Sequence, residues 1–231
     1  MSSHTKRQLT FYLASRSPRR AELLQQLGYC FQTLSVDIDE SQRSDELPAD
    51  FVARLAAEKA RAGHTMLVDV AHADASVILA ADTVVVCDDI ILGKPVDEAD
   101  AAQMLARLSG RTHQVYTGVS LIYPDPVVLP PANRDLPGVV THNPAVLTDY
   151  SALLTHNVVN KTEVSFRTIS PTEVKWYWDT GEPADKAGGY GIQGLGAIFV
   201  QRIEGSYTGV MGLPLFETSQ LLQIAGIRPV G

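Results

Sequence analysis

The sequence predicts an α/β protein built on a mixed β-sheet flanked by helices. Strand-like and helix-like patterns alternate along most of the chain, which is typical of this class. The run over residues 76–86 is rich in Val and Ile and almost continuously apolar, as expected for a central strand covered on both faces. With 231 residues, 45% of them hydrophobic, the chain can bury a sizeable core.

The first half of the chain alternates strands with helices. Runs of apolar, β-branched and aromatic residues predict strands at 9–13, 29–36 and 76–86, and a short return strand at 90–92. Apolar residues that recur every three or four positions predict helices at 21–27, 49–62 and 97–108. Asp88 and Asp89 predict the tight turn before the return strand, and Ser109 and Gly110 end the third helix.

The second half resumes the alternation after a break. Proline is frequent and periodicity is lacking near residues 124–158, which predicts a long surface insertion outside the core. Ser170 and Glu173 form a predicted capping box at the start of a helix. The remaining elements are strands at 114–123, 162–168 and 197–203, helices at 172–179 and 215–225, and glycine-containing loops at 181–196 and 205–214.

The composition argues against several classes of protein. A net charge of −7 does not favour a nucleic-acid surface, which would need a basic stripe. Cys30 and Cys87 are far apart, so we expect buried small side chains rather than a disulfide or zinc ligands. No HExxH motif supports a zinc hydrolase. No run reaches the roughly 18 apolar residues of a membrane span, and no signal peptide is recognised, so a soluble cytoplasmic protein without a membrane partner is expected.

The predicted strand–loop–helix unit at the N-terminus is a candidate anion site. Ser17 suits the N-cap of the helix, and Pro18 suits its first position. A helix N-terminus presents free N–H groups to an anion, and the adjacent Arg19 and Arg20 favour phosphate. A capped helix with two solvated arginines fits the same residues, and spacing alone leaves both interpretations open.

Asp82 interrupts the apolar central strand. A carboxylate there is costly to bury unless it is paired or metal-bound, which favours a general base or a metal ligand. The alternative is an Asp that caps a bulge together with Thr83. Lys59 continues the apolar stripe of the helix at 49–62, so its ammonium points inward, unless its stem snorkels to the surface.

The glycine-rich loop at 181–196 is a candidate ligand-binding loop. Gly189, Gly191 and Gly194 match the spacing of a dinucleotide fingerprint, but the loop leads into a strand and not a helix, so we reject that reading. Glycines let the backbone approach a ligand, and the Gln193 amide can hydrogen-bond the edge of a nucleobase. Lys94 lies on a tight turn between Gly93 and Pro95, and the chain has no P-loop.

The motifs occur in an order that resembles the Maf family of nucleoside triphosphate pyrophosphatases, which was first linked to septum formation. The resemblance covers about 9–123 and 160–226. Its motifs are Ala14-Ser15-x-Ser17-Pro18-Arg19-Arg20, Glu58-Lys59-Ala60, Ala81-Asp82-Thr83-Val84, Gly93-Lys94-Pro95, Leu108-Ser109-Gly110, Gly181-Glu182-Pro183-x-Asp185-Lys186-Ala187-Gly188, Tyr190-Gly191-Ile192-Gln193-Gly194 and Gly209-Val210-Met211-Gly212-Leu213-Pro214.

This resemblance implies a single Maf-like domain over 1–231, related to the ITPase fold, with an elongated mixed sheet and a cleft between two lobes. It implies hydrolysis of a nucleoside triphosphate to the monophosphate and pyrophosphate with Mg²⁺ or Mn²⁺, and often a homodimer. The Tyr190–Gly194 loop looks like that of the branch acting on dTTP and UTP, and modified pyrimidine nucleotides are also implied substrates. The branch acting on 7-methyl-GTP has a different sequence there.

The resemblance also assigns roles to residues. Asp82 matches the general base and metal ligand, and Glu40 is an implied metal partner. The implied substrate-binding residues are Ser15, Arg19, Arg20, Lys59, Thr83, Lys94 and Gln193, of which Arg19, Thr83 and Gln193 match the specificity positions. Arg16 departs from the small residue common at its position.

Two other functions fit the same cleft. A non-catalytic nucleotide-binding regulator of cell division would sense a triphosphate without hydrolysing it. A phosphatase would release orthophosphate and a diphosphate instead of pyrophosphate and a monophosphate. The identity of the products separates all three.

Overall fold

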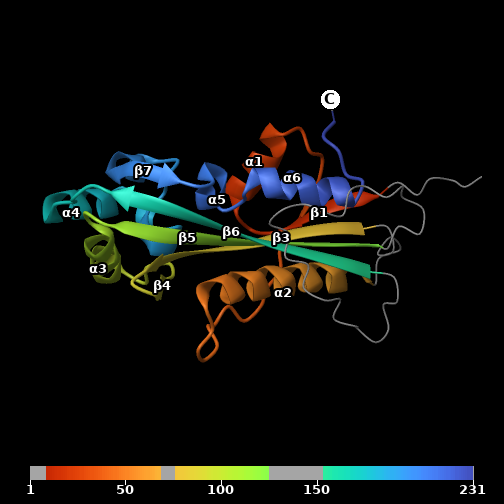
Figure 1. The fold of residues 1–231 in the computed structure, drawn as a ribbon, viewed down its shortest axis with the longest axis horizontal. Coiled ribbons are helices and arrows are strands. Elements are labelled where there is room, and N and C mark those ends of the chain that lie inside the picture. The colour runs from red at the N-terminus through yellow and green to blue at the C-terminus, as the bar shows by residue number, and fades with distance from the viewer. Residues whose placement is uncertain (1–8, 69–75, 125–152, 231) are drawn as a thin grey trace, which may run out of the picture.

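The computed structural model describes residues 9–68, 76–124 and 153–230. They form an elongated seven-stranded mixed sheet with the order β2-β1-β3-β5-β6-β7, and β4 pairs with β3 outside this path. Helices cover both faces, so the predicted α/β class is confirmed (Figure 1). The strands are β1 (Thr10–Ala14), β2 (Gln32–Leu34), β3 (Ser76–Cys87), β4 (Ile90–Leu92), β5 (Thr112–Pro124), β6 (Leu153–Phe166) and β7 (Val200–Glu204).

Three long strands form the spine of the molecule. Antiparallel pairing joins β3 to β5 and β5 to β6 along most of their lengths. The parallel strands β1 and β2 extend one end of the sheet, whereas β4 and β7 extend the other. The sheet therefore has two ends with different neighbours, as expected for two lobes (Figure 1).

The helices divide between the faces and the ends of the sheet. Helix α2 covers one face, and α1, α5 and α6 lie on the opposite face; α3 and α4 pack at the end near β4 and β7 (Figure 1). Their bounds are α1 (Pro18–Gln26), α2 (Pro48–Val68), α3 (Glu98–Leu108), α4 (Pro171–Asp179), α5 (Tyr207–Met211) and α6 (Leu215–Ile224). Short 3₁₀ turns η2 (Glu182–Asp185), η3 (Ala187–Gly189) and η4 (Leu195–Phe199) follow α4.

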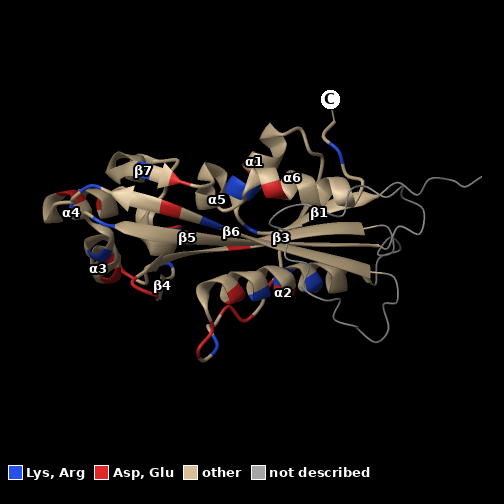
Figure 2. Ribbon diagram, viewed as in Figure 1, with Lys and Arg blue, Asp and Glu red and all other residues tan. Residues whose placement is uncertain are grey.

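Charged residues lie mainly on the helices and connecting loops, with few on the central strands (Figure 2). Strand β3 is buried over almost its whole length, including Asp82, whose residue exposure is only 8%. The central strand is therefore an apolar element with one carboxylate, as its sequence predicts.

Helix α2 sits unusually close to the sheet at Gly118 of β5. A Cβ atom at that position would lie 2.4 Å from the carbonyl oxygen of Val52, so only glycine allows this approach. Val52 and Leu55 pack there against Val84 and Val86 of β3. The close approach fixes the height of α2 over the strand that carries Asp82.

Aromatic side chains fill the core at the other end of the sheet. His113 of β5 lies edge-to-face against Phe166 and Tyr190, with ring centroids 4.8 and 5.4 Å away. Its Nε2 lies 2.8 Å from the Tyr190 hydroxyl. Burial lowers the pKa of His113 to about 4, so the imidazole is neutral in the folded protein at neutral pH.

Several predicted elements differ from the observed ones. The expected surface insertion at 124–158 overlaps the sheet, because Pro124 ends β5 and β6 begins at Leu153. Polar residues at 155–157 hide the strand pattern, but they pair with β5. The rest of that stretch, 125–152, lies outside the described residues.

The other differences are local. Strand β2 spans only Gln32–Leu34, α2 continues to Val68, and the segment predicted as a strand from 197 begins with the turn η4. The predicted loop at 205–214 contains α5. Cys30 is exposed and not buried, since the preceding Tyr29 takes the core position, whereas Cys87 is buried.

The depressed pKa of His113 predicts how stability depends on pH. An unfolded histidine titrates near 6.5, so the unfolded chain takes up a proton as pH falls through that value, before the folded protein does. The free energy of unfolding should therefore decrease between about pH 6.5 and 4, by on the order of 3 kcal/mol from this group. Urea denaturation of wild type and His113→Phe at pH 7 and pH 4 measures it. The variant should lose less stability on acidification, and an equal loss in both proteins would contradict the prediction.

Candidate active site

The candidate site lies at a gap in the edge of β3. The pairing of β1 with β3 ends at Leu13 and Leu79, and β4 starts to pair at Val85. Among the described residues, 80–84 therefore have no strand partner on that edge, although β5 pairs with them on the other. A cleft of about 710 Å³ opens at this gap and is lined by residues from both sheet faces and both ends of the sheet.

All nine residues predicted for the site line this cleft. They are Ser15, Arg19, Arg20, Glu40, Lys59, Asp82, Thr83, Lys94 and Gln193. They come from six separate parts of the chain, so the fold brings together side chains that the sequence could only place in order.

Asp82 forms a buried ion pair with Lys59 on the α2 face of the sheet. The Lys59 Nζ atom lies 2.6 Å from Asp82 Oδ1 and 2.7 Å from Glu40 Oε1, so one ammonium joins two carboxylates. The Asp82 and Lys59 side chains are 11% and 12% exposed, whereas the Glu40 side chain is 52% exposed. Burial opposes ionisation of Glu40, but the hydrogen bond from Lys59 and the charges of the neighbouring cations together outweigh it, so the pKa of Glu40 is lowered.

Thr83, the next residue of β3, belongs to a network on the opposite face. The Arg20 guanidinium donates to Gly212 O at 2.7 Å, to Thr83 Oγ1 at 3.1 Å and to Ser15 Oγ at 3.3 Å. Thr83 Oγ1 lies 2.9 Å from Thr117 Oγ1, which donates to Gly209 O at 2.8 Å. Burial lowers the pKa of Arg20, although nearby Asp82 opposes this change. The hydrogen-bond partners of Arg20 are therefore all uncharged, so they do not neutralise the positive charge that Arg20 brings to the cleft.

The other arginines of the N-terminal unit lie closer to solvent. Arg19 Nη1 lies 3.4 Å from Asp185 Oδ2 and so links α1 to the turn η2. Arg16 forms an exposed contact of 3.9 Å with Asp37 and also lines the cleft. Ser17 precedes α1, but its side chain makes no capping hydrogen bond; its N–H instead donates to Ser15 Oγ at 3.1 Å. Ser17 and Pro18 therefore take the predicted N-cap and first helical positions, although the Ser17 side chain does not cap the helix.

The glycine-rich loop is held by Glu182, a role that the sequence did not predict. Tyr177 donates to Glu182 Oε1 at 2.6 Å, and the backbone N–H groups of Leu195 and Gly196 donate to the carboxylate at 2.8 and 3.0 Å. A Cβ atom at Gly194 would lie 2.1 Å from Glu182 Oε2. The glycine next to Gln193 thus makes room for the carboxylate that orders the loop. An acidic residue within a glycine-rich segment is the signal that could have identified it.

The site offers two carboxylates toward a metal ion. The described residues contain no group of three or more His, Cys, Asp or Glu side chains that could hold a metal. Asp82 and Glu40 nevertheless meet at one ammonium, and Mg²⁺ commonly uses one or two carboxylates together with water and substrate phosphates. The donor set fits a hard divalent cation whose remaining positions are filled by water or by an anionic substrate.

The fold and the cleft define the class of the protein: an α/β protein with a cleft that combines lysines and arginines with a buried carboxylate. The family model described as "Maf-like protein" matches residues 10–225. The chain belongs to the Maf family.

Three relatives show how close the similarity is. A dTTP/UTP pyrophosphatase of Vibrio parahaemolyticus is 47% identical over 218 residues, which cover 94% of this chain and 98% of the relative. One from Pseudoalteromonas translucida is 49% identical over 92% of this chain and 95% of its own length. One from Vibrio cholerae is 46% identical over 91% and 95%, respectively.

Among the helices of the described segments, none combines the length and the apolar character that a membrane span requires. The cytoplasmic location stays a prediction.

Glu182→Gln should loosen the loop that carries Gln193. An amide cannot accept at every position where the carboxylate accepts, so a buried donor loses its partner at a cost of about 1–3 kcal/mol. We expect a lower urea midpoint and faster amide hydrogen exchange at 190–196. Glu204→Gln, which removes an exposed partner of Arg202, is the matched control and should change neither. Unchanged exchange in Glu182→Gln would contradict the role of Glu182.

Proposed function

We propose that this chain is a nucleoside triphosphate pyrophosphatase that hydrolyses dTTP and UTP to the monophosphate and pyrophosphate. The observation that carries the proposal is the buried Asp82–Lys59 pair beside Glu40 in a cleft lined with further cations. The curated relatives named dTTP/UTP pyrophosphatase support the same substrates.

The proposed reaction transfers a nucleotidyl group to water. Water attacks the α-phosphorus, the bond from that phosphorus to the bridging oxygen breaks, and pyrophosphate leaves with the electron pair. Asp82 accepts the proton of the attacking water as general base. A divalent cation held by Asp82 and Glu40 would neutralise phosphate charge.

The cations of the cleft suit the charge that develops on pyrophosphate. Arg19 and Arg20 of α1, Lys59 of α2 and Lys94 after β4 all line the cleft. Guanidinium and ammonium groups bind phosphoryl oxygens and stabilise a negatively charged leaving group. In this proposal the four side chains bind the triphosphate, together with Ser15.

Thr83 and Gln193 are proposed to select the base. Gln193 is exposed at the cleft, on the loop that Glu182 orders. Its amide can donate to and accept from the edge of a pyrimidine. The homodimer implied by the family resemblance stays a prediction.

Asp82→Asn should abolish turnover and retain nucleotide binding. Loss of a general base typically costs 10² to 10⁴-fold in rate, so we expect a fall in kcat of about 10²-fold or more. Pyrophosphate release from UTP and dTTP, with nucleotide binding measured by calorimetry, tests both parts. Asp179→Asn removes an exposed carboxylate that pairs with Lys175, and it should keep full activity.

The products of the wild-type enzyme distinguish the three functions. Pyrophosphate with a monophosphate supports the proposal, and EDTA should abolish the release if the metal takes part. Orthophosphate with a diphosphate would favour the phosphatase, and binding without any turnover would favour the regulator. Full activity of Asp82→Asn would contradict Asp82 as the base.

Gln193→Ala should change the ranking of nucleotides more than their metal dependence. Losing one or two net hydrogen bonds to the base costs about 0.5–1.5 kcal/mol each. We therefore expect kcat/KM for UTP and dTTP to fall about tenfold, with a smaller change for other triphosphates. Gln201→Ala on exposed β7 is the control. A uniform loss across all nucleotides would argue against a role in reading the base.

A further inference from the structure

The loop between β2 and α2 carries Glu40, yet it contains no helix or strand of its own. Most of its residues over 37–46 are exposed. Its internal contacts are short: Asp39 Oδ1 accepts from Ser41 N at 2.9 Å, and Glu46 Oε2 accepts from Arg43 N at 3.1 Å. These contacts shape the loop, but they do not attach it to the rest of the protein.

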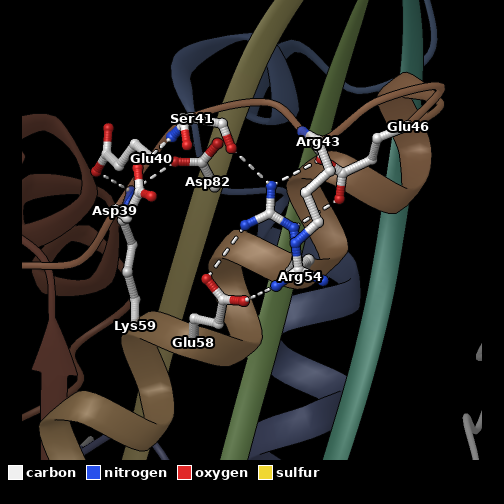
Figure 3. A network of polar contacts seen from close by, with 9 residues as sticks. All are labelled: Asp39, Glu40, Ser41, Arg43, Glu46, Arg54, Glu58, Lys59 and Asp82. Atoms are coloured by element: carbon white, nitrogen blue, oxygen red, sulfur yellow. Dashed lines mark hydrogen bonds and ion pairs between the residues drawn. The ribbon is translucent and has the colours of Figure 1, made fainter.

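Arg54 of α2 attaches the loop at two points (Figure 3). Its guanidinium donates to both carboxylate oxygens of Glu46, with Nε–Oε1 at 2.6 Å and Nη2–Oε2 at 2.7 Å. The same Nη2 donates to the backbone oxygen of Ser41 at 3.0 Å. The Arg54 and Glu46 side chains are only 13% and 9% exposed, so this two-pronged pair is largely shielded from water.

The helix itself orients the guanidinium. Glu58, one turn further along α2, accepts from Arg54 Nη1 at 3.2 Å, and the ring of Phe51 lies 5.5 Å below the guanidinium carbon. Because Glu58 precedes Lys59, the residues that hold the loop and the ammonium that meets Glu40 are on the same rigid element. Ser41, which Arg54 fixes, directly follows Glu40 (Figure 3).

We propose that Arg54 is a positioning residue for Glu40: it holds the 39–46 loop on α2 so that the Glu40 carboxylate meets Lys59 and Asp82. Without this attachment, the loop would keep only the exposed Arg43–Glu58 pair and the contact of the half-exposed Glu40 with Lys59. The consequence for metal binding and turnover rests on the proposed function. The hydrogen bond from Arg54 also lowers the pKa of Glu46 to about 2, which keeps the pair charged across the working range of most enzymes.

Arg54→Met and Arg43→Met provide a matched pair of variants. Both remove one positive charge and one contact with Glu58, but Arg43 is exposed, and in the described structure its side chain makes neither a hydrogen bond nor an ion pair with Glu46 or Ser41. Arg54→Met should detach the loop, and Arg43→Met should leave it in place. Thermal unfolding shows whether each variant is folded. If Arg54→Met does not fold, Glu46→Gln replaces it, because an amide at position 46 cannot accept both hydrogen bonds from Arg54.

The first measurement is Mn²⁺ binding to the full chain without nucleotide, followed by the electron paramagnetic resonance signal of free Mn²⁺. Loss of a residue that orients a metal ligand typically weakens metal affinity 10- to 100-fold. We expect at least a tenfold loss for Arg54→Met and for Glu40→Gln, and less than twofold for Arg43→Met. Unchanged binding by folded Arg54→Met, or no Mn²⁺ binding by wild type, would overturn the proposal.

The second measurement is a double-mutant cycle of Mn²⁺ affinity with Arg54→Met and Glu40→Gln. It separates a role that acts through Glu40 from a purely structural role. If Arg54 acts through Glu40, the double variant should bind Mn²⁺ no more weakly than Glu40→Gln alone. Losses that multiply would overturn the proposal. Arg54→Lys, which has one ammonium in place of the fork, should recover only part of the affinity.

Activity separates this inference from the proposed function. Failure of wild type to release pyrophosphate would refute the proposed function. The double-mutant cycle of Mn²⁺ affinity would then still test whether Arg54 positions Glu40. If wild type is active, Arg54→Met should lower kcat for UTP about tenfold and change KM less, because the base-reading side of the cleft is untouched. A loss confined to KM would overturn the positioning role.

Discussion

The arrangement of the site depends on one ammonium that lies between two carboxylates. Asp82 sits on the most buried strand of the sheet, where an unpaired charge would be costly. Lys59 offsets this cost only if α2 lies close enough to the sheet for its ammonium to reach Asp82. The absence of a side chain at Gly118 allows this close approach. Since Arg54 projects from the same helix and holds the loop of Glu40, α2 positions three parts of one charge cluster.

The opposite wall of the cleft follows a different principle. There the cation Arg20 is held by hydroxyl and carbonyl oxygens, and the loop of Gln193 is ordered by a carboxylate that receives a hydroxyl and two backbone N–H groups. A cation with neutral partners keeps its charge available for an anion. The Glu182 carboxylate, by contrast, already accepts three hydrogen bonds from the protein. Its role is therefore to order the loop and not to bind a ligand.

Local patterns predicted much of this protein, and non-local contacts account for the rest. The apolar run around Asp82 and the inward position of Lys59 are properties of single elements, so the sequence indicated both. The start of β6 at Leu153 depends on pairing with β5 and not on its own alternation. The role of Arg54 rests on its contact with Glu46 in the preceding loop, and that of Glu182 on backbone groups 13 and 14 residues further along the chain. Ser17 fits every local rule for a cap, yet its side chain forms no capping hydrogen bond.

Asp82 and Thr83 are neighbours in sequence, but strand geometry turns them to opposite faces of the sheet. One face carries the proposed chemistry, and the other carries the arginine network and leads toward the proposed base-reading residues. Under the proposed function, nucleotide preference and hydrolysis can therefore be altered separately, although adjacent residues of one strand carry the two roles.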